Sequence, residues 1–169
     1  MRFSTQIFAL VLSLSATSLG APTTKRALTA QSFNEFTVSG GVAGNALAEV
    51  NANFPVDTTD LAGVSASDLA IISSAAQISE QAEVATGGFN DALKAVSGDA
   101  ATALQNGKIK NKVLKLQTDV LRLQIEQAQG KSGLDSQLAA QQKKLATNVA
   151  LDVKAKGQAS TAISFDGTD

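Results

Sequence analysis

The chain has 169 residues, of which 44% are hydrophobic, 17% charged and 4% aromatic, and it contains no cysteine, histidine, tryptophan or tyrosine. This composition excludes disulfides, cysteine nucleophiles, Ser-His-Asp triads, and the Cys or His ligands of zinc and haem. Residues 27–106 carry nine acidic and one basic side chain, whereas residues 107–169 carry ten basic and six acidic ones. We therefore expect acidic helices to pack beside basic ones, and we expect no nucleic-acid partner, since a net basic surface with stacking aromatics is missing.

The N-terminus is typical of a secretory precursor. A basic residue, an apolar run and a stretch of small residues predict a signal peptide over residues 1–20. The dibasic pair Lys25 and Arg26 predicts a processing site that ends a short propeptide, residues 21–26, although the pair is otherwise two ordinary surface charges. No later segment approaches the ~20 apolar residues of a membrane span. We expect a secreted protein, free or wall-associated, that is not transmembrane.

The next part of the chain leads into a helical domain. Residues 27–41 predict an irregular lead, mostly coil, and the helical bundle is predicted over residues 42–157. The first helix is expected from Val42 to Phe54, because apolar side chains recur at helical spacing until Pro55 ends the pattern.

The clearest helix start follows at Ser65. Ser65 can cap the helix while Asp68 reaches back, and Val64 stands at staple distance from Leu69. Apolar residues recur at helical spacing from there to Gly87-Gly88. The two glycines predict a bend or a break, followed by a second short helix.

The longest apolar pattern runs from Ile109 to Gln129. We expect Asp99 to cap a separate turn before it, because Asn106-Gly107 is a typical break signal. Gly130 is the natural end of the long helix.

A capping pair, Ser132 with Asp135, predicts the last helix, which reaches about Gly157. The short link before it forces an antiparallel arrangement. The fold class is therefore all-α, a helical bundle of about four helices ending in an antiparallel helical hairpin. Residues 158–169 are expected to form a disordered acidic tail.

Paired carboxylates are the catalytic device that this composition leaves. The pairs close in sequence are Asp57 with Asp60, Glu80 with Glu83, and Asp166 with Asp169. A glycosidase needs such a pair across a cleft with sugar-binding subsites, whereas these residues are typical of turns, solvated helix faces and a chain end. We expect no enzyme, and no catalytic residue, cofactor or metal site.

Two surfaces are candidates for binding. Lys108, Lys115 and Arg122 repeat every seven residues, which predicts either a solvated helix face or a contact with an anionic surface such as a wall polymer or lipid headgroups. The alanine-rich helices also leave the bundle either closely packed or under-filled, and an under-filled bundle can hold an acyl chain. The residues expected to line such an apolar seam are Ile71, Ile78, Val113, Leu116 and Leu145.

Three stretches carry a family resemblance, namely Gly44–Pro55, Val64–Ile72 and Leu104–Leu116. With them, the chain from Phe33 to Phe165 resembles the ascomycete small secreted protein family. That resemblance implies a fungal secreted protein, and it supplies no activity or functional residues. In size, helicity and lack of cysteine the chain is also loosely similar to fungal hydrophobic surface binding proteins, which favours an apolar partner.

Two hypotheses of function follow. The first is a secreted non-catalytic interaction protein at the cell wall or host interface, with a wall polymer, a host protein or a lipid as partner. It predicts a closed bundle. The alternative is an extracellular carrier or coat protein that binds lipid or apolar surfaces, and it predicts an apolar pocket of at least ~300 Å³.

Overall fold

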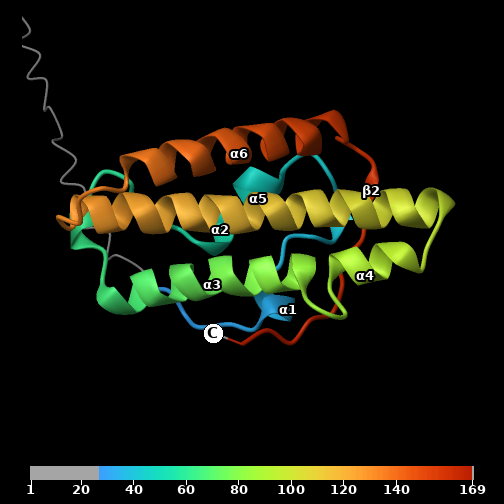
Figure 1. Cartoon of the computed structure of the whole chain (residues 1–169), viewed down its shortest axis with the longest axis horizontal. Helices are drawn as coiled ribbons and strands as arrows, with labels where there is room; N and C mark the ends of the chain where they lie inside the picture. The colour runs from blue at the N-terminus through green and yellow to red at the C-terminus, as the bar shows by residue number, and fades with distance from the viewer. Residues whose placement is uncertain (1–26, 169) are drawn as a thin grey trace, which may run out of the picture.

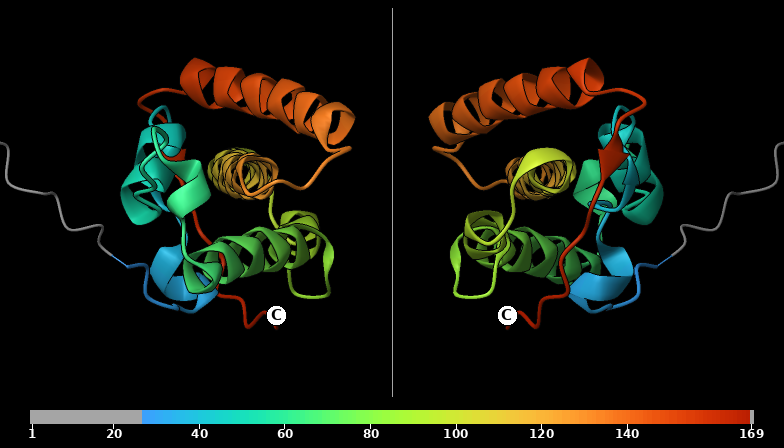
Figure 2. Two further views of the ribbon diagram at one scale, coloured as in Figure 1. Left: turned by 90° about the vertical axis from the view of Figure 1, so that its left-hand side faces the viewer. Right: turned by 90° about the vertical axis from the view of Figure 1, so that its right-hand side faces the viewer.

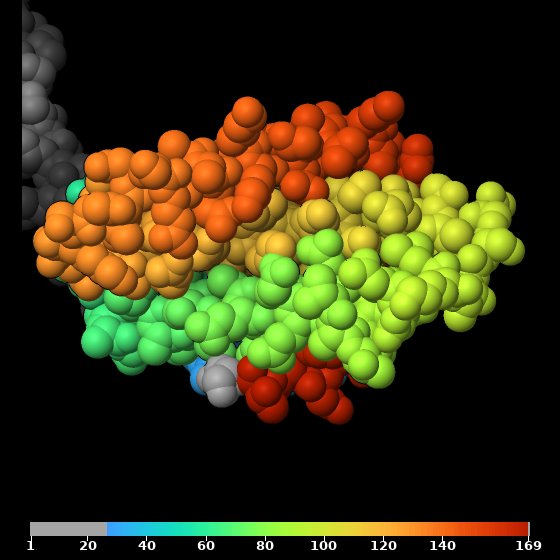
Figure 3. Space-filling view, in the orientation of Figure 1, coloured from blue at the N-terminus to red at the C-terminus, as the bar shows by residue number. Residues whose placement is uncertain are grey.

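The computed structural model describes residues 27–168. Within them the protein is all-α, as the sequence predicts, and its body consists of three long helices, α3 (Ala66–Val84), α5 (Gly98–Ala128) and α6 (Asp135–Lys154) (Figure 1). Helix α5 is the central element, with α3 against one side and α6 against the other. Figure 3 shows α5 between these two helices on the face turned to the viewer.

Shorter elements complete the fold (Figure 2). They are the one-turn helix α1 (Phe33–Phe36), α2 (Ala46–Asn53), the 3-10 turn η1 (Leu61–Gly63), α4 (Phe89–Lys94), and the strands β1 (Gly41–Val42) and β2 (Ala159–Ser160). Of these, α2 and β2 pack against α5, α1 lies against α3, and α4 contacts both α3 and α5. The two strands pair antiparallel, with Gly41 opposite Ser160, so that segments from the two ends of the described chain lie side by side. None of the helices described here is both long enough and apolar enough to cross a membrane.

The core forms where α3 and the N-terminal elements meet α5. Most apolar side chains of α5 are buried and lie on more than one side of the helix, which explains its central position. The buried apolar side chains of α5 are Leu104, Val113, Leu114, Leu116, Val120, Leu121, Leu123 and Ile125. The acidic α3 packs beside the basic α5, as the charge distribution predicts.

The start of α3 is as predicted. The backbone N–H of Asp68 donates to the Ser65 hydroxyl at 3.0 Å, which caps the helix. The Asp68 carboxylate does not complete the expected reciprocal pair, because it accepts a hydrogen bond from the backbone N–H of Leu28 at 2.9 Å. The expected interruption is confirmed, since α3 ends at Val84 and α4 follows Gly88.

The predicted break at Asn106-Gly107 is wrong, because α5 runs through it. A Cβ on Gly107 would overlap the carbonyl oxygen of Thr161, so glycine allows the C-terminal segment to approach the helix closely. Next to this contact, the Asn106 side-chain amide donates to the carbonyl of Ala159 at 2.9 Å, and the N–H of Thr161 donates to the carbonyl of Ala103 at 2.9 Å. The dipeptide is a docking point and not a turn.

The lead is more ordered than the sequence predicts. It contains α1, and β1 finds in β2 a partner more than a hundred residues later in the chain. Helix α2 begins at Ala46, four residues after the predicted start. Its cap comes from α6, where the buried Asp152 carboxylate accepts from the N–H groups of Gly44 and Ala46, both at 2.9 Å.

The C-terminal hairpin is confirmed, with two corrections at the ends of α6. The predicted capping pair is wrong, because the N-cap residue is Leu134 and the described residues give α6 no side-chain cap. The helix ends at Lys154, and Gly157, with φ of 85°, turns the chain into β2.

The Ser65 cap gives the first prediction. Replacing Ser65 by alanine removes the hydroxyl that accepts the Asp68 N–H, and should lower the free energy of unfolding by ~1 kcal/mol. Urea unfolding followed by circular dichroism measures this loss. Ser132→Ala is the control and should leave the midpoint unchanged, since Ser132 does not cap α6.

The Gly107 contact gives the second prediction. By helix propensity alone, Gly107→Ala should stabilise α5 by about 1 kcal/mol. Because the added methyl group overlaps the Thr161 carbonyl, we expect a net destabilisation of about 1–3 kcal/mol instead. Thermal unfolding by circular dichroism distinguishes the two, and a raised melting temperature would show that the C-terminal segment does not dock closely at Gly107.

Candidate functional site

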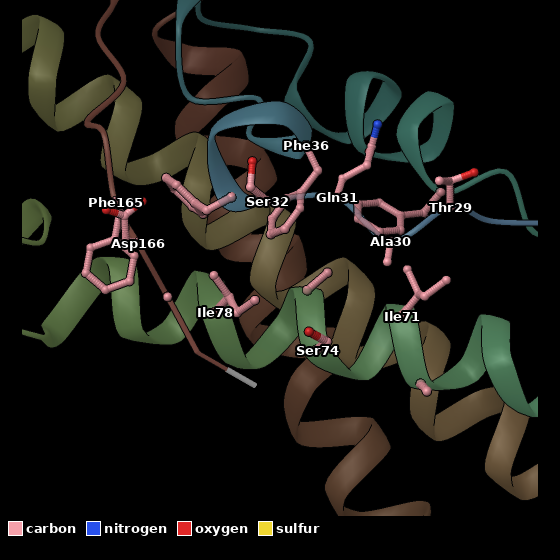
Figure 4. A pocket seen from close by; sticks show the side chains of 15 residues that line it. Thr29, Ala30, Gln31, Ser32, Phe36, Ile71, Ser74, Ile78, Phe165 and Asp166 are labelled. Carbon is pink, nitrogen blue, oxygen red and sulfur yellow. The ribbon is translucent and has the colours of Figure 1, made fainter.

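A pocket of about 340 Å³ lies between the lead, α3 and the last described residues of the chain (Figure 4). The segments that line it, α1 and the last described residues, lie on the side of α3 away from α6 (Figure 2). Its lining residues are Thr29, Ala30, Gln31, Ser32, Phe33, Phe36, Phe54, Ala70, Ile71, Ser74, Ala75, Ile78, Phe165, Asp166 and Gly167.

Phenylalanine rings form a continuous row along the pocket. Phe165 meets Phe33 edge to face with ring centroids 5.9 Å apart, Phe33 meets Phe36 at 5.7 Å, and Phe36 meets Phe54 at 5.9 Å. Such edge-to-face pairs stabilise one another by about 0.5–1.5 kcal/mol beyond their buried area. These four rings therefore form a fixed apolar wall, and they come from segments that are distant in the sequence.

Helix α1 positions two of these rings. Its start is fixed by the Glu35 carboxylate, which accepts hydrogen bonds from the backbone N–H of Ser32 at 2.8 Å and from the Ser32 hydroxyl at 2.9 Å. These bonds, the backbone one first, lower the pKa of Glu35. One helical turn then brings Phe33 and Phe36 to the same side, since residues three apart are neighbours on a helix.

The C-terminal segment closes one end of the pocket, so the expectation of a disordered tail is wrong for the residues described. The N–H of Phe165 donates to the Asn34 side chain at 3.1 Å. The Gln81 side chain forms two hydrogen bonds with the backbone of Thr168. Its amide N–H donates to the Thr168 carbonyl at 2.7 Å, and its amide oxygen accepts from the Thr168 N–H at 3.1 Å. Gly167 lies so close to Ile78 that a Cβ would overlap it.

The polar groups of the pocket are mostly uncharged. Thr29, Ser32 and Ser74 provide hydroxyls, Gln31 an amide, and Asp166 a carboxylate at the C-terminal end. No lysine or arginine of the described residues is among the lining side chains. The pocket can therefore surround an apolar body, whereas the carboxylate of a fatty acid would find no cation there.

The predicted apolar seam is divided by the structure. Ile71 and Ile78 point into the pocket (Figure 4). Val113 and Leu116 are buried in α5 at 0% and 3% exposure, and Leu145 of α6 packs against the core as a partly buried side chain. The expected seam therefore does not form one cavity: two of its five residues line the pocket beside α3, and the other three do not.

Lys108 and Lys115 of the predicted basic row lie against neighbouring helices. Lys108 donates to the Asn90 side chain at 2.6 Å, and Lys115 forms ion pairs with Glu80 and Glu83 of α3. Their side chains are 18% and 20% exposed, so this is no freely solvated face. The carboxylates already neutralise much of the positive charge.

Arg122 is held in the same way. Its guanidinium pairs with Asp119 at 2.7 Å and with Glu126 at 3.1 Å, and Lys131 joins Glu126 at 2.9 Å. Burial alone would lower the pKa of Arg122 and raise that of Glu126, but these partners outweigh it, so the pKa of Arg122 is raised and the pKa of Glu126 is lowered. Contact of the row with an anionic surface stays a prediction.

The other predicted residues show no gathered chemistry. Asp57 accepts from the N–H and hydroxyl of Thr59, and Asp60 accepts from the N–H of Gly63, which are turn and cap roles. Over residues 27–168, no three histidine, cysteine, aspartate or glutamate side chains come together as a metal site. The predicted processing pair, Lys25 and Arg26, lies outside the described residues.

Sequence reasoning missed the phenylalanine row. Phe33 and Phe36 are spaced for one helical turn, and Ser32 with Glu35 is a capping-box pair that could have indicated it. No local signal indicates Phe165, because its partner Phe33 is remote in the sequence.

The fold and the pocket define a cysteine-free, all-α protein with an aromatic-walled pocket beside its main bundle. The chain belongs to the family described as domain of unknown function DUF8454, which matches residues 28–164. No curated protein and no solved structure matches the chain. The matched span includes the pocket residues of the lead and α3, and it ends one residue before Phe165.

The lowered pKa of Glu126 gives a third prediction. A carboxylate whose pKa is lowered by folding stabilises the protein above its unfolded pKa, about 4.3 for glutamate, and this stabilisation is lost as the pH falls through the folded value. Glu126→Gln should therefore lower the melting temperature at neutral pH, and the difference from wild type should disappear in acid. A difference that is equal at all pH values would contradict the assigned ion pairs.

Proposed function

We propose that this protein is a secreted, non-catalytic carrier that binds a small apolar molecule in the phenylalanine-lined pocket. The single observation that carries the proposal is the pocket itself. Its volume of about 340 Å³ exceeds the ~300 Å³ at which ligand sites begin, and apolar side chains with a few polar groups are the usual lining of such sites. Secretion rests on the sequence pattern of residues 1–26.

The preformed wall supports binding of a rigid or chain-like apolar body. Phe33 and Phe36 are 1% and 3% exposed, and Phe54 is 4% exposed, so their positions are set by packing before a ligand arrives. A preformed site loses less conformational entropy on binding than one that must be assembled.

The charge around the pocket supports a particular class of ligand. Asp166 lines it, Glu35 adjoins it at Ser32, and no described lysine or arginine lies in the lining. An apolar molecule with a neutral hydroxyl or a positively charged amine fits this field better than one with a carboxylate, because a carboxylate would lose its hydration without gaining a counter-ion. The proposed ligand is therefore an apolar alcohol or amine.

The alternative of an interaction protein at a wall or host interface predicts a bundle without a sizeable cavity. The volume of the pocket favours the carrier over that hypothesis. A carrier can still act at the cell wall. The two hypotheses differ in the part of the protein that is essential, which is the pocket for a carrier and the outer surface for an interaction protein.

The test compares three probes with the same alkyl chain, namely dodecanol, dodecylamine and dodecanoate, by isothermal titration calorimetry. We expect the alcohol and the amine to bind and the carboxylate to bind at least about tenfold more weakly. Ser74→Phe, which places a ring inside the pocket, should weaken binding about tenfold or more. The control is Val84→Phe, which adds the same ring to α3 at a 57% exposed position.

If the alcohol or the amine binds Ser74→Phe as tightly as Val84→Phe, the ligand does not occupy the phenylalanine-lined pocket. Preferential binding of dodecanoate, or no binding of any probe, would overturn the proposal. Circular dichroism of each variant confirms that the helical content is retained.

A further inference from the structure

A second hollow lies on the other side of α3, between α3 and α6, with α5 as its floor. It has a volume of about 430 Å³ and faces the viewer in Figure 3. The residues of α3 that line it, among them Ser73 and Gln77, differ from those that line the phenylalanine pocket. We call this hollow the polar groove.

The polar groove combines a small apolar floor with polar walls. Ala76 and Leu116 lie in the floor and are 7% and 3% exposed. The walls present amides, hydroxyls and charges of both signs, including Glu80 and Asp119 as acceptors and Arg122 as a donor. This mixture differs from the aromatic wall of the first pocket and calls for a different ligand.

The ion pairs hold several of these groups in place. The Asp119 Oδ1 atom receives hydrogen bonds from Nε of Arg122 at 3.0 Å and from its Nη2 at 2.7 Å. Lys115 is fixed by Glu80 and Glu83. Donors and acceptors that are fixed before binding give a ligand directional hydrogen bonds at a low cost in entropy.

Two groups of α6 are left without partners. The Oε1 atom of Gln141 is buried and accepts no hydrogen bond from the part of the chain that the structure describes. Leaving a buried acceptor unpaired is unfavourable, so such groups in native proteins call for an explanation. Lys144, an exposed residue, forms no ion pair within residues 27–168.

The pattern of charge selects the class of ligand. An anion would meet the carboxylates of Glu80 and Asp119, and a cation would meet the positive charges of Lys115, Arg122 and Lys144. A neutral molecule with several hydroxyl groups avoids both repulsions, because each hydroxyl can donate to Gln141 or a carboxylate and accept from a cation. We propose that the polar groove binds a neutral saccharide.

This site is independent of the proposed function, since it uses other residues on another face of α3. The probes are neutral trisaccharides of glucose, of mannose and of N-acetylglucosamine, each titrated into the ¹⁵N-labelled protein and followed by two-dimensional NMR. We expect at least one of them to shift the amide signals of α6 near Gln141 and of α3 near Gln77, with no effect on the signals of α1.

Adjacent residues of α6 provide matched variants. Gln141→Leu removes the buried acceptor and should weaken binding about tenfold or more, without loss of stability, because removing an unpaired buried polar atom is not destabilising. Lys144→Ala should weaken binding as well. The controls are Gln142→Leu and Lys143→Ala, whose side chains are exposed and outside the groove, and both should bind as wild type.

The charged analogues test the selection. Trigalacturonate, an anion, and the trisaccharide of glucosamine, a cation, should bind more weakly than the neutral sugars. Tighter binding of the anion would overturn the proposal in favour of a polyanion site. The absence of shifts with all the neutral probes, or equal binding by Gln141→Leu and Gln142→Leu, would overturn it as well.

Discussion

The structure depends on the docking of both ends of the described chain onto one stretch of α5. The C-terminal segment lies in the space that Gly107 leaves, with Ser160 donating to the carbonyl of Ser39 at 2.6 Å. Three residues further along α5, Lys110 is 1% exposed, and its ammonium donates to the carbonyls of Gly40 and Val42 at 2.9 and 3.1 Å. The same ammonium also pairs with the Glu49 carboxylate of α2 at 2.8 Å, so three acceptors from the lead and α2 satisfy it. Moving these segments away from α5 would leave a buried charge without partners, which is strongly unfavourable.

This docking explains why a pocket exists beside the bundle. Because β1 and β2 are held together on α5, the lead before β1 and the segment after β2 leave in neighbouring directions and pass over α3 side by side (Figure 2). Phe33 comes from the first and Phe165 from the second, and their edge-to-face contact joins them above α3. The pocket is the space that remains between these two segments and the helix. Its wall is thus set by contacts on α5 that lie outside the pocket.

Local signals predicted much of the fold, and remote contacts account for the errors. Ser65 caps α3 because its partner is three residues away, and such a pair is visible in the sequence. Asn106-Gly107 is a turn signal in most contexts, but here its role is set by Thr161, more than fifty residues later. The same reason hid the pocket. Ile71 and Ile78 were predictable from their period, whereas Phe165 joins the lining through its contact with Phe33, a residue far away in the sequence.

Helix α3 also shows why apolar periodicity predicted only part of the candidate sites. Its period identifies residues of the buried stripe that packs into the core, among them Ala75 and Ala82. A helix flanked by other segments on both sides has two further faces, one with Ile78 beside the phenylalanine row and one with Glu80 beside the polar groove. Sequence analysis assigned Glu80 to a solvated side, because its partner Lys115 belongs to another helix. The two faces share a rigid backbone but no lining side chain, so the chemistry of one face can change while the lining of the other stays the same.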